Sequence, residues 1–323
     1  MSRAFAHRVL PFDGVDDFLA GTAPYLREGV EDGDRVVAVT SVASGFVLRE
    51  ALGPVADGVE FAEAERWYRH PARTFADCLG DAEEAARQGR RLRLLGEPVW
   101  TSRPEAEVVE WQRVEALVNV AFRETGAWIL CPYAVRALPA GVVAAARRTH
   151  PESVRGSRVV ANPGYVDPWL YSARCDREPL SDPPADAELL KIDVPDLYWL
   201  RAYVSDYARQ AALPEEDLQR LLVAVTEVVT NALRHGRPPI AMRLWTGPGP
   251  VLVCEVTDEG RWAPGTGYGL IPPRGAGRGR FGLWAVRLLC SAVQIRTGDR
   301  TVVRLLLRMP HVPAGRNVTV DRA

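Results

Sequence analysis

Residues 227–235 read EVVTNALRH, a polar pattern set in an apolar segment. Because an α-helix repeats every 3.6 residues, Glu227, Asn231 and His235 fall on one face and form a polar stripe. A carboxylate and a carboxamide one turn apart can hold a hydrated Mg²⁺ and orient a hydroxyl group or a water molecule, as phosphoryl transfer requires. A solvated helix face has the same pattern, so the stripe alone leaves both interpretations open.

The next segment, VLVCEVTDEG at residues 251–260, predicts a strand that ends in a carboxylate and a glycine. The exocyclic amine of adenine is a hydrogen-bond donor, so Asp258 is a suitable acceptor for it. Gly260 has no Cβ and lets the backbone approach the face of a purine ring. An ordinary strand-ending turn has the same residues, so this segment is also ambiguous by itself.

A glycine- and arginine-rich run, GAGRGRFGLWAVRLLC, then precedes an apolar helix that we expect to begin near Phe281. Its glycines are Gly275, Gly277, Gly279 and Gly282. Backbone N–H groups at a helix start, beside Arg278 and Arg280, form an anion site that suits a triphosphate. Flexible surface loops have a similar composition, which is the alternative interpretation.

The closing segment, SAVQIRTGDRTVVRLLLRM, predicts a hairpin around Gly298 with Thr301 at the start of its second strand. In their order over residues 190–310, these elements resemble the GHKL ATPase superfamily, and most closely its anti-sigma-factor serine kinase branch. EVVTNALRH looks like the N box, DEG like the first glycine box, GRGRFGLW like the second, and Thr301 like the terminal threonine. The resemblance implies a C-terminal α/β sandwich, the Bergerat ATP-binding fold, with a mixed sheet and with ATP and Mg²⁺ between helix and lid.

The resemblance also implies a role for each matched residue. Glu227 would be the catalytic general base, Asn231 the Mg²⁺ ligand and Asp258 the adenine anchor. Gly260 would pack on adenine and Thr301 would bond it through water, while the second glycine box would wrap the phosphates. The implied cofactor-binding residues are Asn231, His235, Asp258, Gly260, Gly277, Gly279, Arg280, Gly282 and Thr301.

The first glycine box departs from the superfamily pattern at one position. A second glycine usually follows two residues after the first, and Trp262 occupies that place here. The indole could remodel the lid or weaken nucleotide binding, or it could simply cover the end of the apolar sheet face. Trp262 therefore bears on catalysis more than on the fold.

Lys191 is the only lysine in the chain. A P-loop requires a Gly-Lys-Ser/Thr sequence, and a eukaryotic-type kinase requires a strand lysine on the phosphates. Lys191 lies before Ile192 and Asp193, at a predicted domain start, and fits neither motif. Any ATP chemistry must therefore use a route that needs no lysine.

The composition predicts a soluble protein whose partners are proteins or small ligands. A chain of 323 residues, of which 47% are hydrophobic, can bury two cores, and no apolar run is long enough to span a bilayer. The first residues lack the order of an export signal, so we expect a cytoplasmic location and no membrane contact. A formal net charge of −1, spread along the chain, argues against direct nucleic-acid binding. The five scattered cysteines argue against a disulfide framework and a zinc knuckle.

A linker rich in proline and acidic residues, DREPLSDPPADAE, separates the two halves of the chain. Upstream of it, strand-like and helical runs alternate, which predicts a doubly wound, mostly parallel sheet with helices on both faces. The strand-like runs are residues 34–41, 91–98, 127–133 and 157–163, and the helical runs lie near 45–52, 71–88, 104–123 and 139–148. The predicted boundaries give an N-terminal domain at 1–175, a linker at 176–189, the ATP-binding kinase domain at 190–310 and a loose tail at 311–323.

The N-terminal half has its own ordered signature, with His7 at the first strand and then HPARTF, LLGEPVWTSR, EWQRVEALVNVAF and CPY. This set resembles the MEDS sensory domain over most of residues 1–160, which implies a small-molecule ligand. The candidate sensing residues are His7, His70, Glu97, Trp100, Arg103, Glu115 and Cys131. Glu97 and Cys131 are expected at the carboxyl ends of parallel strands, where ligands gather. A glutamate in this position also caps helices, a lone cysteine is also an ordinary core residue, and the spacing of the histidines and Cys131 does not indicate a metal site.

Three classes of function remain open. In the first, the second half is an ATP-dependent serine/threonine kinase of the anti-sigma-factor type, which acts on a sigma factor or a STAS-type anti-anti-sigma partner under the control of the sensory half. The second is a non-catalytic switch that docks on a partner and has a degenerate nucleotide site. The third, a sensor histidine kinase, is disfavoured because His70 and His150 each precede a proline. The aromatic-rich amphipathic segment 197–213 suits core packing or a subunit contact, so a homodimer is compatible with the sequence.

Overall fold

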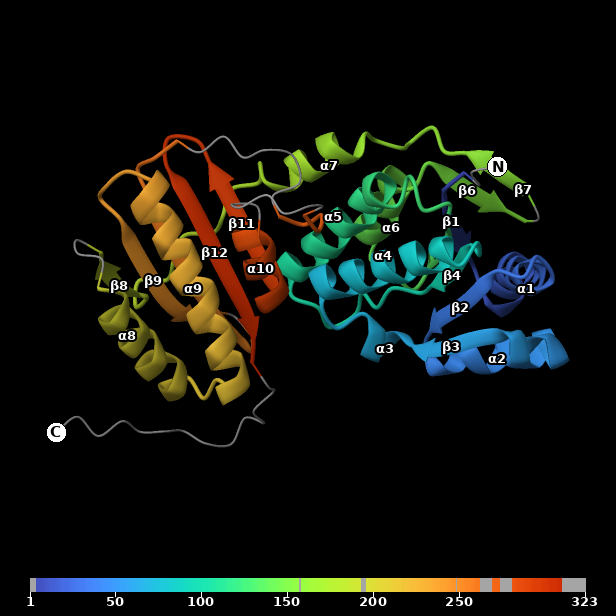
Figure 1. Cartoon of the computed structure of the whole chain (residues 1–323), viewed down its shortest axis with the longest axis horizontal. Coiled ribbons are helices and arrows are strands. Elements are labelled where there is room, and N and C mark those ends of the chain that lie inside the picture. The colour runs from blue at the N-terminus through green and yellow to red at the C-terminus, as the bar shows by residue number, and fades with distance from the viewer. Residues whose placement is uncertain are drawn as a thin grey trace. The chain divides into compact units, whose positions relative to one another are not determined.

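The computed structural model describes residues 4–156, 158–192, 196–247, 249–261, 269–273 and 281–309 (Figure 1). The chain divides into two compact units between Glu178 and Pro179, and residues 269–273 and 281–284 group with the first unit. Each unit is built around one sheet. The finer domain boundaries given by the sequence stay predictions.

The first unit contains a seven-stranded sheet in the order β3-β2-β4-β5-β1-β6-β7. Neighbouring strands run parallel, except that β6 and β7 at one edge are antiparallel. The strands are β1 (Ala6–Phe12), β2 (Arg35–Thr40), β3 (Val59–Glu63), β4 (Leu92–Gly96), β5 (Trp128–Ala134), β6 (Glu152–Arg155) and β7 (Arg158–Ala161). The helices are α1 (Val15–Glu31), α2 (Val42–Leu52), α3 (Ala64–Trp67), α4 (Pro71–Arg87), α5 (Glu105–Ala121), α6 (Ala140–Thr149) and α7 (Pro168–Cys175), with a 3₁₀ helix η1 at Gly53–Gly58.

Helices cover both faces of this sheet because its strands send alternate apolar side chains into two cores. In β2, Val37 and Val39 belong to the core that α4 and α5 cover, whereas Val36 and Ala38 belong to the core that α1 and α2 cover. Strands buried on both faces are typical of parallel sheets between two helix layers. The predicted doubly wound, mostly parallel sheet is therefore confirmed, although β3, β6, α1 and α7 were not among the predicted runs.

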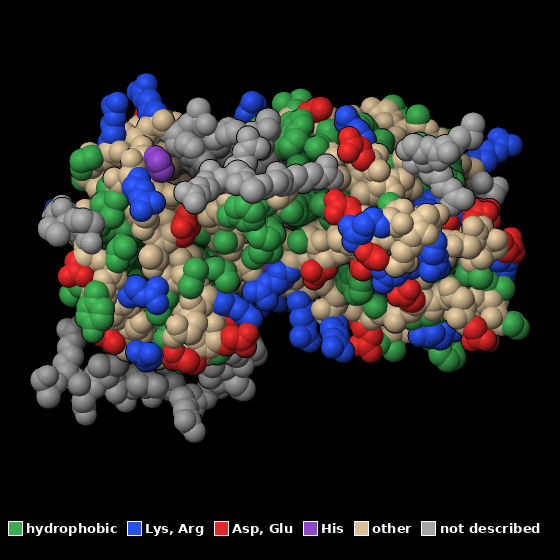
Figure 2. All heavy atoms as spheres, in the orientation of Figure 1, with side chains coloured by type: hydrophobic (Ala, Val, Ile, Leu, Met, Phe, Trp, Pro, Cys, Tyr) green, Lys and Arg blue, Asp and Glu red, His purple; other side chains and the backbone are tan. Residues whose placement is uncertain are grey.

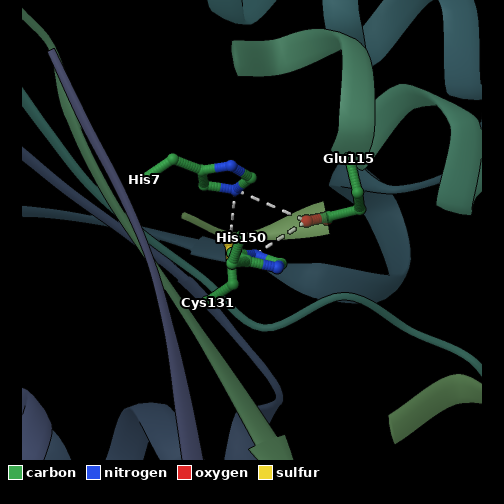
Figure 3. A group of neighbouring side chains, drawn as sticks. All are labelled: His7, Glu115, Cys131 and His150. Atoms are coloured by element: carbon green, nitrogen blue, oxygen red, sulfur yellow. Dashed lines mark hydrogen bonds and ion pairs between the residues drawn. The ribbon is translucent and has the colours of Figure 1, made fainter. Parts of the chain in front are cut away.

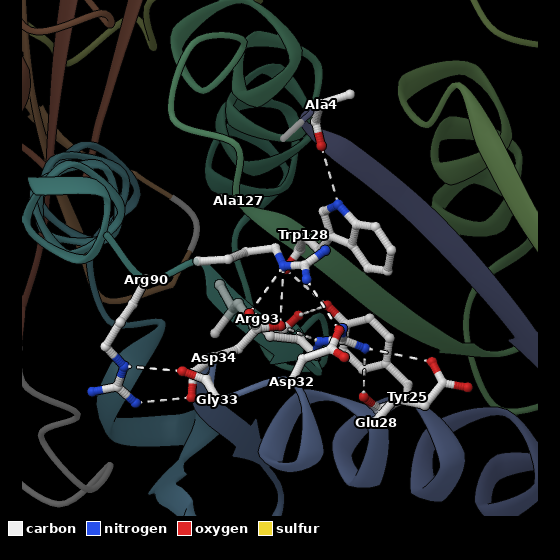
Figure 4. Close-up of polar contacts among 12 residues, drawn as sticks. Ala4, Tyr25, Glu28, Asp32, Gly33, Asp34, Arg90, Arg93, Ala127 and Trp128 are labelled. Atoms are coloured by element: carbon white, nitrogen blue, oxygen red, sulfur yellow. Dashed lines mark hydrogen bonds and ion pairs between the residues drawn. The ribbon is translucent and has the colours of Figure 1, made fainter. Parts of the chain in front are cut away.

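Buried charges close the amino-terminal end of this sheet (Figure 4). The fully buried Asp34 carboxylate accepts hydrogen bonds from Arg93 Nε at 2.8 Å and from Arg91 Nε at 3.0 Å. The guanidinium carbons of Arg91 and Arg93 lie 4.1 and 4.8 Å from the ring centroid of Trp128. Tyr25 of α1 donates its hydroxyl to the Trp128 carbonyl at 2.8 Å. Each buried charge therefore has partners that offset its desolvation, and the cluster ties β2, β4, β5 and α1 together.

The second unit contains a five-stranded sheet in the order β11-β12-β10-β9-β8. The strands are β8 (Glu188–Lys191), β9 (Ala241–Thr246), β10 (Val251–Asp258), β11 (Ala292–Thr297) and β12 (Thr301–Arg308). The helices are α8 (Leu197–Gln210), α9 (Glu215–His235) and α10 (Phe281–Leu289), of which residues 285–289 belong to this unit. The predicted strand at 251–260, the helix start at Phe281 and the hairpin around Gly298 are all confirmed.

The α/β fold of the second unit agrees with expectation, but its sheet is antiparallel at every described pair rather than mixed. The connections explain this correction. Hairpins join β9 to β10 and β11 to β12, and the pair of helices between β8 and β9 returns the chain so that β9 runs in the opposite direction. Strands β10 and β11, which precede and follow α10 in the sequence, run in the same direction. They do not pair with each other because β12 lies between them.

Helix α9 is the main cover of the second sheet, and it packs on β10 and β12 (Figure 1). Its buried residues follow helical spacing: Leu218, Leu221, Leu222, Ala224, Val225, Val228, Val229 and Ala232. Helix α8 packs on α9 and buries Leu200 and Val204. Because Tyr198 and Trp199 of α8 remain 87% and 50% exposed, segment 197–213 serves core packing with its inner face and leaves aromatic rings on its outer face.

The surface carries charged side chains of both signs. They are interspersed over the face drawn in Figure 2, in line with the net charge of −1. None of the helices in the described part of the chain combines the length and the apolarity that crossing a bilayer needs.

Candidate functional site

Helix α9 carries the acid and the amide of the polar stripe. It begins after Pro214 with three acidic residues in its first turn, which suits the positive end of the helix dipole. Glu227 and Asn231 are both half-buried, and Asn231 Nδ2 donates to Glu227 Oε1 at 3.1 Å. His235 is the last residue of the helix and is exposed. The structure thus brings the first two members of the stripe together and leaves His235 at the helix end.

Asp258 ends strand β10 and is held by backbone groups. Its Oδ1 accepts hydrogen bonds from the N–H of Gly260 at 2.7 Å and from the N–H of Arg237 at 3.3 Å. Arg237 lies two residues beyond the end of α9. The carboxylate therefore joins the end of the strand to the end of the helix.

Two glycines make room for this junction. A Cβ on Gly236 would lie 2.5 Å from Cγ of Asp258, and a Cβ on Gly260 would lie 2.5 Å from Oδ1 of the same residue and 2.9 Å from Cα of Gly236. Carbon atoms do not approach other heavy atoms so closely, so both positions must lack a side chain. The last turns of α9, which include Asn231, are thereby fixed against Asp258.

Thr301 completes the junction from the neighbouring strand. It is the register partner of Asp258 across β10 and β12, and its Oγ1 donates to the carbonyl of Gly260 at 2.9 Å. The turn after β10 is therefore fixed from both sides, by the Asp258 carboxylate at its N–H and by the Thr301 hydroxyl at its carbonyl.

The second oxygen of Asp258 remains available. Within the described residues no hydrogen bond reaches Oδ2, whereas Oδ1 already has two donors. Burial raises the pKa of the Asp258 carboxyl above its usual value, the two backbone N–H donors lower it, and the charge of Glu259 raises it. A buried, oriented acceptor with one free oxygen is suited to bind a donor such as an exocyclic amine.

The remaining predicted phosphate-binding residues are placed only in part. Gly282 lies in the first turn of α10 and is half-buried. Gly277, Gly279 and Arg280 lie outside the described residues, as does Trp262. The sequence expectations for these four positions therefore stay predictions.

A cavity of about 730 Å³ lies elsewhere in the second unit. It is lined by the segment before β8, by the turn between β11 and β12, and by Arg243 and Glu255. Glu255 and Asp258 are three residues apart on β10, so their side chains point to opposite faces of the sheet. The cavity therefore opens on the face opposite to the Asp258 side chain. It is not part of the junction described above.

In the first unit, two of the predicted sensing residues have capping roles. Glu97 directly follows β4, as expected, and accepts from Ser41 N at 2.8 Å and from Ser44 Oγ at 3.2 Å at the start of α2. His70 is the N-cap of α4, where its Nδ1 accepts from Arg73 N at 3.3 Å. Both residues therefore stabilise helix starts.

Trp100 and Arg103 take part in packing. Trp100 is buried, and its ring lies 6.0 Å from that of Tyr133. Arg103 donates to the carbonyls of Val99 and Tyr68 and lies over the ring of Trp111 at 5.1 Å. These contacts order the loop between β4 and α5.

The other three sensing candidates, His7, Glu115 and Cys131, converge in one buried cluster with His150 (Figure 3). Cys131 lies in the middle of β5, which corrects the expectation that it ends a strand. His150 was considered from the sequence only as a phosphate acceptor. Its place in the cluster was missed because its partners lie between 19 and 143 residues away, which spacing rules do not reach.

Both halves of the chain match known domain families. Residues 6–151 match the family described as MEDS, the MEthanogen/methylotroph, DcmR Sensory domain, and residues 193–307 match the Histidine kinase-like ATPase domain. These matches confirm both resemblances inferred from the sequence. No curated protein matches the chain.

Solved structures that match the chain are remotely similar, as two of them show. The RsbU and RsbW domains of a Mycobacterium tuberculosis protein are 18% identical, with a TM-score of 0.29, over 39% of this chain and 32% of that chain. The Acinetobacter baumannii histidine kinase AdeS is 13% identical, with a TM-score of 0.26, over 74% of this chain and 97% of that chain. The chain thus covers about a third of the first structure, and both similarities are too remote to carry an argument about function.

Proposed function

The chain joins a MEDS sensory domain to a histidine kinase-like ATPase domain, and we propose that it is a sensor-controlled, ATP-dependent protein serine/threonine kinase of the anti-sigma-factor type. The ATPase domain implies ATP binding. In the proposal Mg²⁺ accompanies the nucleotide, and the phosphate acceptor is a serine or threonine of a STAS-type anti-anti-sigma protein, with a sigma factor as the alternative partner.

One observation carries the proposal: the junction fixes the Asp258 carboxylate, a buried acceptor, against the end of the helix that bears Glu227 and Asn231. Asp258 Oδ2 would accept the adenine amine, and the bare backbone of Gly260 would face the ring. Thr301 would hold the turn in place. The residues present therefore fit the adenine end of ATP.

The geometry of the polar pair suits the phosphate end. Because Asn231 Nδ2 donates to Glu227, the Oδ1 atom of Asn231 is the one left to face Mg²⁺, which prefers oxygen ligands. Magnesium would neutralise charge on the phosphate oxygens. Glu227 would take the proton of the acceptor hydroxyl while the hydroxyl oxygen bonds to the γ-phosphorus and the bond to the leaving ADP oxygen breaks.

A non-catalytic docking switch is the second candidate function. It is favoured by Trp262, which replaces the usual second glycine of the first glycine box. In that case nucleotide would bind weakly or not at all, and no phosphate would be transferred. A sensor histidine kinase is less well supported, because His150 is 0% exposed and His70 is engaged at a helix cap.

Nucleotide binding is tested by thermal unfolding with and without Mg-ATP. A ligand at a hundred times its Kd adds about 2.7 kcal/mol to the free energy of unfolding. We expect this gain for the parent chain and a much smaller one for Asn231→Ala. Gln219→Ala, on the exposed side of the same helix, is the matched control and should respond like the parent. Equal, negligible shifts in all three would favour the docking switch.

Phosphoryl transfer is tested with γ-labelled ATP and a purified STAS-type protein. We expect label on a serine or threonine of that protein with the parent chain and none with Glu227→Gln. The variant should keep the Mg-ATP stabilisation, since Gln can still accept from Asn231 Nδ2. Binding without transfer in the parent would reject the kinase and retain the nucleotide-binding switch.

A further inference from the structure

Four side chains that can bind a metal meet inside the first unit (Figure 3). His7 comes from β1, Glu115 from α5, Cys131 from β5, and His150 from the turn between α6 and β6. One ligand atom of each lies within 4.8 Å of the others. Their exposure runs from 0% for His150 to 8% for Glu115. We call these four residues the tetrad.

The ring of His7 is oriented by Asn119, one turn after Glu115 on α5. Asn119 Nδ2 donates to the carbonyls of Thr149 at 2.7 Å and Ala116 at 3.0 Å, which fixes the direction of the amide. The Asn119 Oδ1 atom, an acceptor only, then lies 3.1 Å from His7 Nδ1. Nδ1 of His7 must therefore carry the proton, and the neutral ring presents the Nε2 lone pair on its other side.

The ring of His150 is oriented in the same way. Its Nδ1 lies 2.8 Å from the carbonyl oxygen of Ala146, which can only accept. Nδ1 of His150 is thus the donor, and a neutral ring again leaves Nε2 as a lone pair. Both histidines have the second partner that metal-binding histidines almost always have.

The remaining polar atoms of the tetrad face one another: two imidazole lone pairs, a carboxylate oxygen and the Cys131 thiol. Glu115 Oε2 lies 3.1 Å from His150 Nε2 and 3.5 Å from His7 Nε2, and Cys131 Sγ lies 3.7 Å from His7 Nε2. Glu115 Oε2 and His150 Nε2 are buried atoms without a hydrogen-bond partner. The Cys131 thiol can satisfy only one of the facing lone pairs, so a positive charge at the centre of the cluster would stabilise the others.

We propose that the tetrad binds one divalent transition metal ion, with Zn²⁺ as the preferred ion. Tetrahedral zinc bonds of about 2.0 to 2.3 Å put neighbouring ligand atoms roughly 3.3 to 3.8 Å apart, close to the three separations above. Two imidazoles, a thiolate and a carboxylate are a ligand set that zinc accepts and that magnesium and calcium do not favour. The site is separate from the proposed ATP site and lies wholly in the first unit, which matches the MEDS sensory domain and is called the sensory unit below.

The surroundings suit such a site. The Nδ1 acceptors of both rings fix the neutral form of the imidazoles, with Nε2 as the lone pair, and this is the form that binds metals. Metal binding would replace the proton of the Cys131 thiol by a metal–sulfur bond and release that proton to solvent.

A second proton on His150 is the metal-free alternative, since Nε2–H could then donate to Glu115 at 3.1 Å. In that state the Cys131 thiol would donate to His7 Nε2 at 3.7 Å, so two separate hydrogen bonds would hold the four groups in pairs. A metal satisfies all four ligands at once, which is why we favour it. The experiment below distinguishes the two.

The test uses the full chain with its purification tag removed. Metal is stripped with a chelator, folding is checked by circular dichroism, and Zn²⁺ is titrated in competition with a chromophoric chelator. We expect one Zn²⁺ per chain. Co²⁺ in its place should give the intense visible bands of a tetrahedral ion together with a near-ultraviolet band from thiolate-to-cobalt charge transfer.

Variants separate the tetrad from other metal-binding groups. Cys131→Ser should remove the charge-transfer band and lower the Zn²⁺ affinity by at least about tenfold. Asn119→Leu, which removes only the acceptor of His7 Nδ1, should lower it by about 10- to 100-fold. Cys78→Ser, a buried thiol of the same core outside the tetrad, should leave stoichiometry and spectrum unchanged. Cys175→Ser, at a partly exposed thiol, should also change neither.

Three results would overturn the proposal. The first is a folded parent chain that binds no stoichiometric Zn²⁺. The second is a Co²⁺ spectrum without thiolate charge transfer, which decides the matter even where a variant fails to fold. The third is binding that is lost in Cys175→Ser but kept in Cys131→Ser.

Discussion

The tetrad of the sensory unit and the Asp258 junction of the ATPase unit both gather polar side chains around a place for charge, but in opposite surroundings. In the tetrad every ligand is buried, and second partners such as Asn119 and Ala146 fix the histidine rings. In the ATPase unit, Glu227 and Asn231 of α9 are only half-buried, and Asp258 at the junction keeps one oxygen available. The first arrangement suits an ion that stays, and the second suits a ligand that must enter and leave.

The two regions also differ in how buried polarity is used for stability. The sensory unit closes the amino end of its sheet with charges that have almost no contact with solvent, Asp34 and Arg93 among them. The ATPase unit relies at its junction on backbone donors and on the absence of side chains at Gly236 and Gly260. A charge deletion should therefore affect the first unit most, and a small added side chain should affect the second.

The largest effect is expected for Asp34→Ala. It would leave Arg91 and Arg93 buried without their main counter-ion, which costs about 3 to 5 kcal/mol when a buried pair is broken. Hydrogen exchange measured on separate peptides should show faster opening of β2 and β4 and unchanged exchange in α9. The control Glu84→Ala removes an exposed partner of Arg87 and should leave hydrogen exchange unchanged in β2, β4 and α9. Equal acceleration in α9 would show that the two units unfold together and would remove the contrast.

A smaller loss of stability is expected for Gly260→Ala. The new Cβ would lie 2.5 Å from Asp258 Oδ1, so strand end and helix end must move apart, at about 1 to 3 kcal/mol. Urea unfolding of the second unit should shift accordingly, and stabilisation by Mg-ATP should fall. Gly298→Ala, where no atom lies within 4 Å of the added Cβ, is the matched control. If Gly260→Ala unfolded at the same urea concentration as the parent and kept its stabilisation by Mg-ATP, the close packing of Gly260 against Asp258 would be contradicted.

Asp258→Asn should change nucleotide choice with little change in fold. The amide Oδ1 can still accept from Gly260 and Arg237, but its nitrogen is a donor and would face the adenine amine. We expect ATP affinity to fall about tenfold, roughly 1.4 kcal/mol, and the ratio of GTP to ATP affinity to rise, because guanine has an acceptor at the corresponding position. Isothermal titration with both nucleotides measures this ratio. An unchanged ratio would mean that Asp258 does not distinguish adenine from guanine.

The same contrast explains what the sequence could predict. The α9 stripe lies within nine residues, and its helix spacing alone places Glu227 beside Asn231. Central strands such as β2 and β5 were predicted because their apolar runs are buried on both faces. The short strands β3, at one edge of the sheet, and β6, next to the other edge, were missed, since VEFAE and ESVR contain charged residues and lack a continuous apolar run.

The tetrad could not be predicted from spacing because its geometry depends on the order of strands. His7 and Cys131 are 124 residues apart and approach only because β1 pairs with β5 in register. His150 joins them because β6 pairs with the other edge of β1. Residue type singled out three of the four positions, but the partnership itself is a property of the sheet.

The smallest effect is expected for Thr301→Val, which keeps the side-chain shape and removes one hydroxyl. The Gly260 carbonyl would lose the hydrogen bond that Thr301 now donates at 2.9 Å, at a cost of about 1 kcal/mol. Because Asp258 still holds the N–H of Gly260, the turn should loosen without opening, and Mg-ATP affinity should fall only a few-fold. Thr301→Ser, which keeps the donor, should bind like the parent. If Thr301→Ser lost binding and Thr301→Val kept it, the methyl group and its packing would matter more than the hydrogen bond, and the junction would resemble the packed interior of the sensory unit more than an adaptable ligand site.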